Sequence, residues 1–486
     1  MSSTVKGLIA GIAAVILLGG GIAAMKLTEP KPETADSSSA ADESVPLKIY
    51  EGDYNDIKTL SVKNKNGGYT LKRTYRAASA EEQSRFEIAE LENVKLDAIL
   101  LSEFAPNAAT LTASKLIEEN CQDFSRFGLD LPETEVTIAF DGENKQDITL
   151  LVGNDTPSGD VYVRLKDSDT VYSAASSFIK SYSYEKEYFV SRVVLEEPAE
   201  EDFPIVSSIK VHRTDLEHDI VLEYAGESES GGTTATHVMT SPVNAYLDIS
   251  DSVNYTHGLF GLSADSVLSI APTEEERSFA GIDEPLCTVV MKVEDGTEYV
   301  LRIGNRYDKD GSGQECYIGY FEGTDILWLF NADSVPWVTM KPEDAMSSLV
   351  FGSYIYDLSS LEVTSDSRTA KFSFEGSSAD DYKVKLDGND YDLERYKQFY
   401  QALIKAPAEE ICLTDEGIGR LMASVVLSYN NGKEKETVEF YETDENKVII
   451  KKNGVTSFRC RSSFVEKALI PNILKLQGNE EFVTNW

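Results

Sequence analysis

The stretch FGLDLPETEVTIAF, residues 127–140, returns in altered form as AGIDEPLCTVVMKV at residues 280–293. Both copies contain the spacing Gly-x-Asp-x-Pro, followed by a run in which apolar and polar residues alternate. Alternation with a period of two predicts a strand with one buried face, and a glycine followed by a proline is typical of a chain corner. Each copy is therefore expected to form a corner and then an antiparallel strand.

The two copies remain similar beyond this stretch. Each continues through an Asp-Gly turn into an apolar run that ends in Gly-Asn, ITLLVGN at 148–154 and YVLRIGN at 299–305, and then into two further strand-like runs. A third copy around Gly417 keeps the strand-like runs but lacks the Asp, the Pro and the Gly-Asn ending. A period of about 150 residues indicates duplication of a whole domain, not a short-repeat solenoid.

A strand pair is expected ahead of each copy. After the first of these strands, Asn66-Gly67 is a strong hairpin signal. The three leading strands share an alternating pattern and read DIKTLSVK at 56–63, IVSSIKVH at 205–212 and LSSLEVTS at 358–365.

Helices are expected between the two halves of the outer copies. Asn93 can cap a helix that stops at Pro106, and Asp392 can cap one that stops at Pro407. The sequence therefore predicts the α+β class: an N-terminal transmembrane helix, followed by three repeated α+β units built on antiparallel β-meanders with one helix each. The predicted segments are a tip at 1–6, an anchor at 7–25, a polar tether at 27–46, repeat units at 48–195 and 196–350, and a divergent unit at 351–480.

The predicted anchor is GLIAGIAAVILLGGGIAAM, which has no charged residue and is long enough to cross the hydrocarbon core of a bilayer. Lys6 precedes it and a mostly acidic segment follows, so the positive-inside rule predicts a cytoplasmic tip. The expected localisation is the cell membrane, single-pass, with the C-terminal bulk extracytoplasmic. A cleaved signal peptide is the alternative.

The charge balance limits the partners. With 45 Lys and Arg against 83 Asp and Glu, the net charge is −38. Such a surface repels nucleic acid and favours cations or basic partners. The five cysteines are scattered without a CxxC pair, so buried free thiols are favoured over a zinc site or a disulfide framework.

No sequence motif names a reaction. Asp308, Asp310 and Ser312 resemble the first half of a calcium loop, but the twelfth position is Gly319, and a polar turn is favoured. His212 and His218 flank an expected hairpin turn, where a ligand role is not favoured. The run 326–338 holds two tryptophans and is interpreted as core more readily than as a docking surface. We therefore assign no catalytic, cofactor-binding or metal residue, and no cofactor.

The ordered elements FGLDLP, DG, VGN, VYV and SSF, behind an apolar N-terminal run, resemble the bacterial family known as domain of unknown function 4340. The first unit matches best and the third poorly. The resemblance implies an envelope protein that accompanies ABC-type export components, and it supplies no catalytic residues.

The expected function is that of a non-catalytic, membrane-anchored extracytoplasmic scaffold or binding protein, an accessory part of an ABC-type transport system. Its expected partners are the membrane, ABC-type transporter subunits or other envelope proteins, and no nucleic acid. The alternatives are a cell-envelope hydrolase and a ligand-capturing module.

Overall fold

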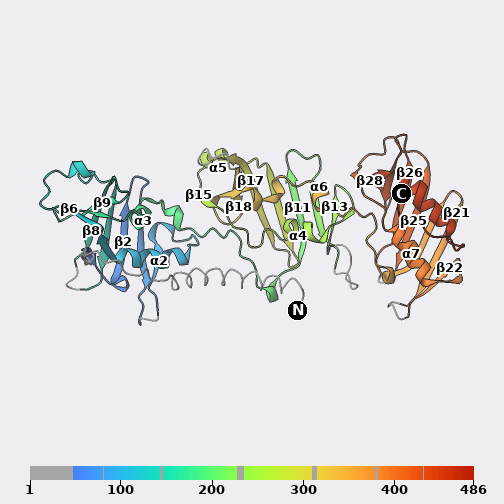
Figure 1. Ribbon diagram of the computed structural model, residues 1–486, viewed down its shortest axis with the longest axis horizontal. Coiled ribbons are helices and arrows are strands. Elements are labelled where there is room, and N and C mark those ends of the chain that lie inside the picture. The colour runs from blue at the N-terminus through green and yellow to red at the C-terminus, as the bar shows by residue number, and fades with distance from the viewer. Residues whose placement is uncertain are drawn as a thin grey trace, which may run out of the picture. The chain divides into compact units, whose positions relative to one another are not determined.

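Antiparallel sheets make up most of the regular secondary structure of the described chain in the computed structural model (Figure 1). The structure describes residues 47–486 except 80–81, 143–145, 227–234, 309–314, 377, 379–380 and 431. A small sheet pairs β1 (Leu47–Glu51) with β5 (Thr110–Ala113). Three large sheets draw their strands from residues 57–174, 206–331 and 358–461.

The order of strands across each large sheet differs from their order along the chain. The first sheet contains β4 (Arg85–Ile88), β3 (Tyr69–Tyr75), β2 (Ile57–Lys63), β7 (Thr134–Phe140), β8 (Ile148–Asp155), β9 (Val161–Leu165), β10 (Val171–Ala174) and β6 (Lys115–Glu118). The second contains β14 (Ala245–Tyr246), β13 (His237–Ser241), β12 (Ile220–Tyr224), β11 (Val206–Arg213), β16 (Cys287–Val293), β17 (Glu298–Tyr307), β18 (Cys316–Phe321), β19 (Ile326–Asn331) and β15 (Ser266–Ile270). The third contains β23 (Asn389–Tyr391), β22 (Lys383–Leu386), β21 (Arg368–Glu375), β20 (Leu358–Ser365), β25 (Leu421–Tyr429), β26 (Glu436–Glu442), β27 (Lys447–Lys452), β28 (Val455–Arg461) and β24 (Glu410–Ile411).

The three large sheets share one connectivity. In each, a leading hairpin lies beside a later four-stranded meander, and β2 pairs with β7 as β11 does with β16 and β20 with β25. A strand from the segment between hairpin and meander then forms the outer edge: β6, β15 and β24. The unit boundaries predicted from the sequence remain predictions, but each sheet lies within one predicted unit.

The repeated stretches form the central strands because their apolar residues alternate toward the core. In β7, Thr134, Val136 and Ile138 are buried while the residues between them are partly exposed. In β16 the buried positions are Cys287, Val289, Met291 and Val293. This period matches the pleat of a sheet with one face packed on the core.

The repeated glycine corner and the repeated Gly-Asn ending pack against each other. Gly128 and Gly281 have φ values of 68° and 69°, which favour glycine. A Cβ on Gly281 would lie 2.8 Å from Oδ1 of Asn305, and one on Gly304 would lie 1.9 Å from the carbonyl oxygen of Ala280. In the third copy, Gly417 has a φ of 75° but meets no described atom within 4 Å. The third copy therefore lacks the close packing between the corner glycine and a Gly-Asn pair that is found in the first two copies.

Helices cover parts of the sheets. Helix α7 begins after Asp392, as predicted, and ends at Leu403. Helix α2 differs from the prediction: its cap is Asp97, not Asn93, and Pro106 lies inside it. The helices of the described chain are α2 (Ala98–Ala109), α3 (Ser176–Ile179), α4 (Ile249–Thr256), α5 (Glu274–Ala280), α6 (Pro342–Ala345), α7 (Leu393–Leu403) and α8 (Ile470–Lys475).

The predicted α+β class with one helix per unit is therefore wrong, because strands outnumber helices in the described chain and each predicted unit holds more than one helix. The missed helices are brief. Helix α5, for example, has seven residues and is held by a capping box between Thr273 and Glu276.

Among the residues that the structure describes, no helix combines the length and apolar character needed to cross a membrane. Helix α2 has 12 residues, which span about 18 Å, against the roughly 30 Å of a hydrocarbon core. This finding contradicts the prediction of a single-pass transmembrane protein and the localisation based on it. The predicted anchor at 7–25, the tip before it and the tether at 27–46 lie outside the described residues.

Candidate functional site

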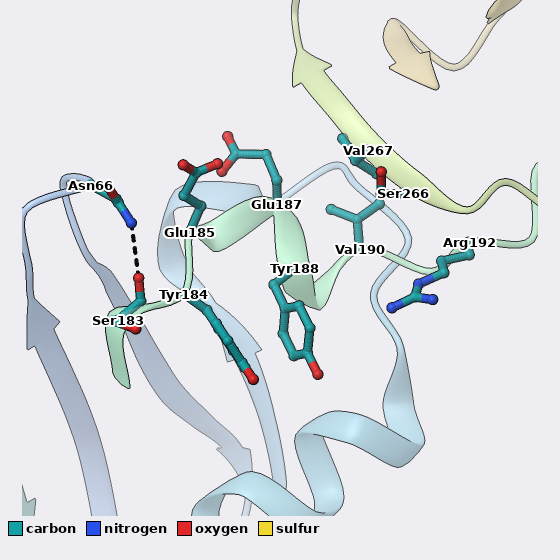
Figure 2. Close-up of a pocket in the computed structure, with 10 residues that line it drawn as sticks. All are labelled: Asn66, Ser183, Tyr184, Glu185, Glu187, Tyr188, Val190, Arg192, Ser266 and Val267. Carbon is teal, nitrogen blue, oxygen red and sulfur yellow. Dashed lines mark hydrogen bonds between the residues drawn. The ribbon is translucent and has the colours of Figure 1, made fainter. Parts of the chain in front are cut away.

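A groove of about 470 Å³ lies where the segment after the first sheet meets an edge strand of the second (Figure 2). One wall is the segment Ser183–Tyr188 with Val190 and Arg192, and the other is formed by Ser266 and Val267 of β15. In Figure 2, Glu185 and Glu187 project to one side of their segment while Tyr184 and Tyr188 project to the other. We call this site the first groove.

The β2–β3 turn holds one end of the Ser183–Tyr188 segment in place. The side-chain amide of Asn64 donates to the carbonyl oxygens of Tyr182 and Tyr184, at 2.8 and 2.9 Å. The amide of Asn66 donates to the carbonyl oxygen of Ser183 at 3.0 Å (Figure 2). The predicted Asn-Gly turn is present, and its amides also position a wall of the groove.

Buried side chains hold the other end of the segment. Phe189 is fully buried, and its ring centroid lies 4.8 Å from that of Tyr69 and 5.1 Å from that of Phe104. Its carbonyl oxygen accepts from the backbone N–H of Asp97, which starts helix α2. The segment is therefore held by hydrogen bonds at one end and by buried side chains at the other. Tyr184 and Tyr188 lie between these two ends.

The charged and aromatic side chains that line the first groove are Tyr184, Tyr188, Glu185, Glu187 and Arg192, so carboxylates outnumber the cation by two to one. Tyr184 and Tyr188 are 38% and 37% exposed, and their ring centroids are 4.1 Å apart. Among the described residues, no ion pair is found for Glu185 or Glu187. Tyrosine presents a large contact area at low conformational cost, and carboxylates beside it attract cationic side chains. This lining suits a basic protein segment.

A second groove, of about 510 Å³, lies where the second and third sheets meet. Beneath it, Lys452 on β27 and Glu436 on β26 form a buried ion pair at 3.3 Å, with side chains only 3% and 5% exposed. The hydroxyl groups of Tyr246 and Tyr429 donate to Oε2 of Glu436 at 2.8 and 3.1 Å. Since Tyr246 belongs to the second sheet, this network ties the two sheets together.

Burial controls the electrostatics of this network. Removal from water lowers the pKa of Lys452, an effect that the adjacent Glu436 carboxylate opposes. Burial also raises the pKa of Tyr246 well above its usual value, with the Glu436 charge adding to the shift. The Lys452 ammonium lies 3.9 Å from the centroid of the Tyr246 ring. Tyr246, Tyr429 and Lys452 all contact the Glu436 carboxylate, although its Oε1 accepts no hydrogen bond within the described chain. We interpret the network as a lock between sheets.

The segment that resembles the first half of a calcium loop, for which a polar turn is favoured, lies only partly within the described residues. Asp308 is described, whereas Asp310 and Ser312 lie outside the described residues. Among the residues that the structure does describe, no group of three or more His, Cys, Asp or Glu side chains could hold a metal ion.

The histidines include a pair that sequence analysis missed. His212 and His218 do flank the β11–β12 turn, and Nδ1 of His212 lies 2.7 Å from Oδ1 of Asp219. His237 and His257, however, stack edge to face with ring centroids 5.5 Å apart. Burial lowers the pKa of both rings, and for His257 the proximity of His237 adds to the effect. One lies on β13 and the other just after helix α4, so no single period in the sequence connects them.

The remaining candidates belong to the core. Trp328 and Trp337 are 2% and 0% exposed, which confirms the core interpretation of 326–338. All five cysteines are free and buried, as favoured from their scattered spacing. Burial raises the pKa of the Cys287 thiol to about 12, so it is an inert apolar group and not a nucleophile.

The first groove was not predicted. Its aromatic wall is the run YSYEKEYF at 182–189, dense in tyrosine and glutamate and close to the predicted unit boundary at 195. An aromatic and acidic run at a domain boundary is the signal that could have found it. The opposing wall, on β15, gave no comparable signal.

The protein is thus built from antiparallel sheets of common connectivity, with a groove where the first sheet gives way to the second. Residues 86–285 match the family model described as Domain of unknown function (DUF4340). The segment contains every residue lining the first groove except Asn66. Comparison with curated proteins found no match, and comparison with solved structures found none either.

Proposed function

We propose that the protein is a non-catalytic scaffold that holds a partner protein in its first groove, and that the partner belongs to an ABC-type transport system. The observation that carries the proposal is the pair of half-exposed tyrosines, Tyr184 and Tyr188, on a segment fixed at both ends. Tyrosine is enriched in protein interfaces and among the residues that contribute most to binding.

Charge supports a basic partner surface. The chain carries a net charge of −38, and Glu185 and Glu187 stand beside the tyrosines. Complementary charge raises the rate of encounter and selects among partners. The ABC-type partner rests on the family resemblance alone, and capture of the partner tests it.

The experiment is affinity capture of the tagged full-length protein from a detergent extract of its own cells, with the bound proteins identified by mass spectrometry. We expect transporter subunits with the wild type and at least a tenfold loss with Tyr184→Ala/Tyr188→Ala, since interface tyrosines commonly contribute about 2 kcal/mol or more each. Tyr75→Ala is the matched control, because Tyr75 is 41% exposed and does not line the groove.

Circular dichroism and thermal melting establish that both variants fold. Recovery of transporter subunits in equal amounts from all three proteins would show that the first groove is not the binding site. Recovery of no transporter subunit with the wild type would contradict the proposed partner.

A further inference from the structure

Asn66, which lines the first groove, is followed by Gly67 in the turn between β2 and β3. Both residues are exposed, and a Cβ placed on Gly67 would meet no described atom within 4 Å. The φ of Gly67 is 111°, a conformation that residues with a side chain rarely adopt. The backbone that follows Asn66 is therefore open to solvent, and no side chain hinders an approach to it.

The hairpin does not need this dipeptide in order to turn. The other two leading hairpins turn through TDLEHD at 214–219 and DS at 366–367, and neither turn contains an asparagine before a glycine. In the first hairpin, the N–H of Gly67 donates to the carbonyl oxygen of Asn64 at 3.1 Å. This turn hydrogen bond must open before the nitrogen of Gly67 can react.

An asparagine in this setting can react with its own backbone, and asparagine is among the thermolabile residues. The backbone nitrogen of Gly67 attacks Cγ of Asn66, and the proton of that nitrogen leaves with the side-chain nitrogen as ammonia. The product is a cyclic imide, which one water molecule opens at either carbonyl to give aspartate or isoaspartate. The net reaction converts the amide and one water into a carboxylic acid and ammonia, and it needs no other reactant.

The amide that this reaction removes is a hydrogen-bond donor to the groove wall. The side-chain nitrogen of Asn66 donates to the carbonyl oxygen of Ser183 at 3.0 Å (Figure 2). An aspartate, with a usual pKa of about 3.9, is charged at neutral pH and can only accept hydrogen bonds. Two acceptors would then face each other, so the bond to Ser183 is lost. Isoaspartate also adds a CH2 group to the backbone of the turn.

Asn64 limits the extent of the change. Its amide still donates to the carbonyl oxygens of Tyr182 and Tyr184, at 2.8 and 2.9 Å. The wall Ser183–Tyr188 is therefore loosened near Ser183 and is not detached from the hairpin.

A second exposed Asn-Gly pair, Asn453-Gly454, provides a contrast. There Oδ1 of Asn453 accepts from the backbone N–H of Thr437 at 2.8 Å. A carboxylate at position 453 keeps this acceptor, whereas a carboxylate at position 66 loses the donor on which the groove wall depends. Deamidation therefore has a local structural consequence at Asn66 that it does not have at Asn453.

We infer that Asn66 is a site of spontaneous deamidation, and that its conversion to aspartate or isoaspartate loosens the wall Ser183–Tyr188 and weakens partner binding in the first groove. The effect on binding rests on the proposed function, whereas the reaction and the loosening do not. The added charge is exposed, and an exposed charge contributes little to an interaction, so the lost donor decides the sign of the effect. Because solvent does not reverse the reaction, binding declines with the age of the molecule.

The first test follows the reaction in the full-length protein during incubation at mildly alkaline pH. Peptide mapping by mass spectrometry, with an enzymatic assay for isoaspartate, measures conversion at Asn66 and at Asn64, which precedes a lysine. We expect aspartate and isoaspartate at position 66 and an intact Asn64. Asn66→Gln is aged in parallel, because the longer side chain forms the cyclic imide far more slowly and keeps an amide. An Asn66 that retains its amide throughout would overturn the inference.

The second test measures the wall by hydrogen exchange in Asn66→Asp and in the matched control Asn453→Asp, which adds the same charge but keeps its acceptor. Circular dichroism checks that both variants fold. We expect the amides of residues 183–188 to exchange roughly fivefold faster in Asn66→Asp than in the wild type, the effect of one lost hydrogen bond. Asn453→Asp should exchange like the wild type. Equal exchange of this segment in the two variants would overturn the loosening.

Partner capture then separates this inference from the proposed function. We expect Asn66→Asp to recover roughly fivefold less transporter subunit than Asn453→Asp, for the same reason. Equal or stronger capture by Asn66→Asp would overturn the effect on binding. Capture of no transporter subunit by the wild type would contradict the proposed function, while conversion of Asn66 and faster exchange of the wall would still establish the modification site.

Discussion

The glycines of the repeated corner differ in how closely other residues pack against them. Gly281 and Gly417 have nearly the same backbone conformation, with φ of 69° and 75°, yet only Gly281 has a neighbour, Asn305, against it. The amide of Asn305 is itself held by a hydrogen bond of 2.8 Å to the carbonyl oxygen of Phe279. The two positions therefore separate the cost of a left-handed backbone from the cost of close packing.

We predict that Gly417→Ala lowers the free energy of unfolding by about 1–2 kcal/mol, since a residue with a Cβ is strained at this φ. Gly281→Ala should cost about 1–3 kcal/mol more, because its Cβ also displaces a fixed asparagine. Urea unfolding followed by fluorescence measures both. Equal losses in the two variants would show that the corner does not depend on the packing of Asn305.

At the scale of elements, the sequence predicted strands better than helices. Strand β20 matches the expected run 358–365 residue for residue, and β7 and β16 end where the two repeated stretches end, because each run alternates cleanly. The start of helix α2 was wrong for a tertiary reason: Leu96 bridges Val190, and the carbonyl oxygen of Lys95 accepts from Ser191. Residues that pair with a distant segment cannot also form the first helical turn, and no local pattern reveals such pairing.

The contact between β13 and the end of helix α4 makes the fold sensitive to acid. His237 and His257 have lowered pKa values in the folded protein, because burial disfavours their charged forms. Below the usual histidine pKa of about 6.5 the unfolded chain therefore takes up protons first. Stability is greatest above that pH and is lost as the pH falls toward the lowered folded values.

We predict that the free energy of unfolding falls as the pH drops below about 6.5, and that His237→Gln/His257→Gln makes this fall shallower. Glutamine keeps a donor for the carbonyl oxygen of Val206, which Nε2 of His237 contacts at 2.7 Å. Urea titrations at several pH values supply the comparison, with His218→Gln at an exposed position as the control. An unchanged slope in the double variant would rule out this pair as the source.

At the scale of the whole described molecule, the sequence indicated that a unit is repeated, but it did not indicate the contacts between neighbouring sheets. Hydrophobic periodicity reports which face of a strand is buried, whereas a joint depends on which residues of distant segments meet. Tyr246 and Glu436 are 190 positions apart, and their hydrogen bond leaves no local trace. The first groove was missed for the same reason, although its tyrosine-rich wall is evident in the sequence at 182–189.

We predict that Lys452→Met destabilises the protein by about 3–5 kcal/mol, because it leaves the carboxylate of Glu436 buried without its counter-charge. Lys452→Met/Glu436→Gln should recover most of this loss, since glutamine is neutral and still accepts from Tyr246. Calorimetry measures the transition temperatures. Lys292→Met is the control, because the Lys292–Glu298 pair is exposed and pairs of that kind contribute at most about 1 kcal/mol. Similar small shifts in all three variants would refute the lock.

The shared connectivity also governs how the protein is made. Each leading hairpin completes its sheet only with a strand far downstream: Leu60 pairs with Ile138, Ile209 with Met291 and Leu361 with Leu427. At a synthesis rate of roughly 5–20 residues per second, a newly emerged hairpin waits several seconds for its partner strand. During that interval the apolar face and the open edge of the hairpin are accessible to other chains. This happens once for each of the three leading hairpins. Each leading hairpin is therefore a point at which the unfinished chain can pair with another chain before its own partner strand has been made.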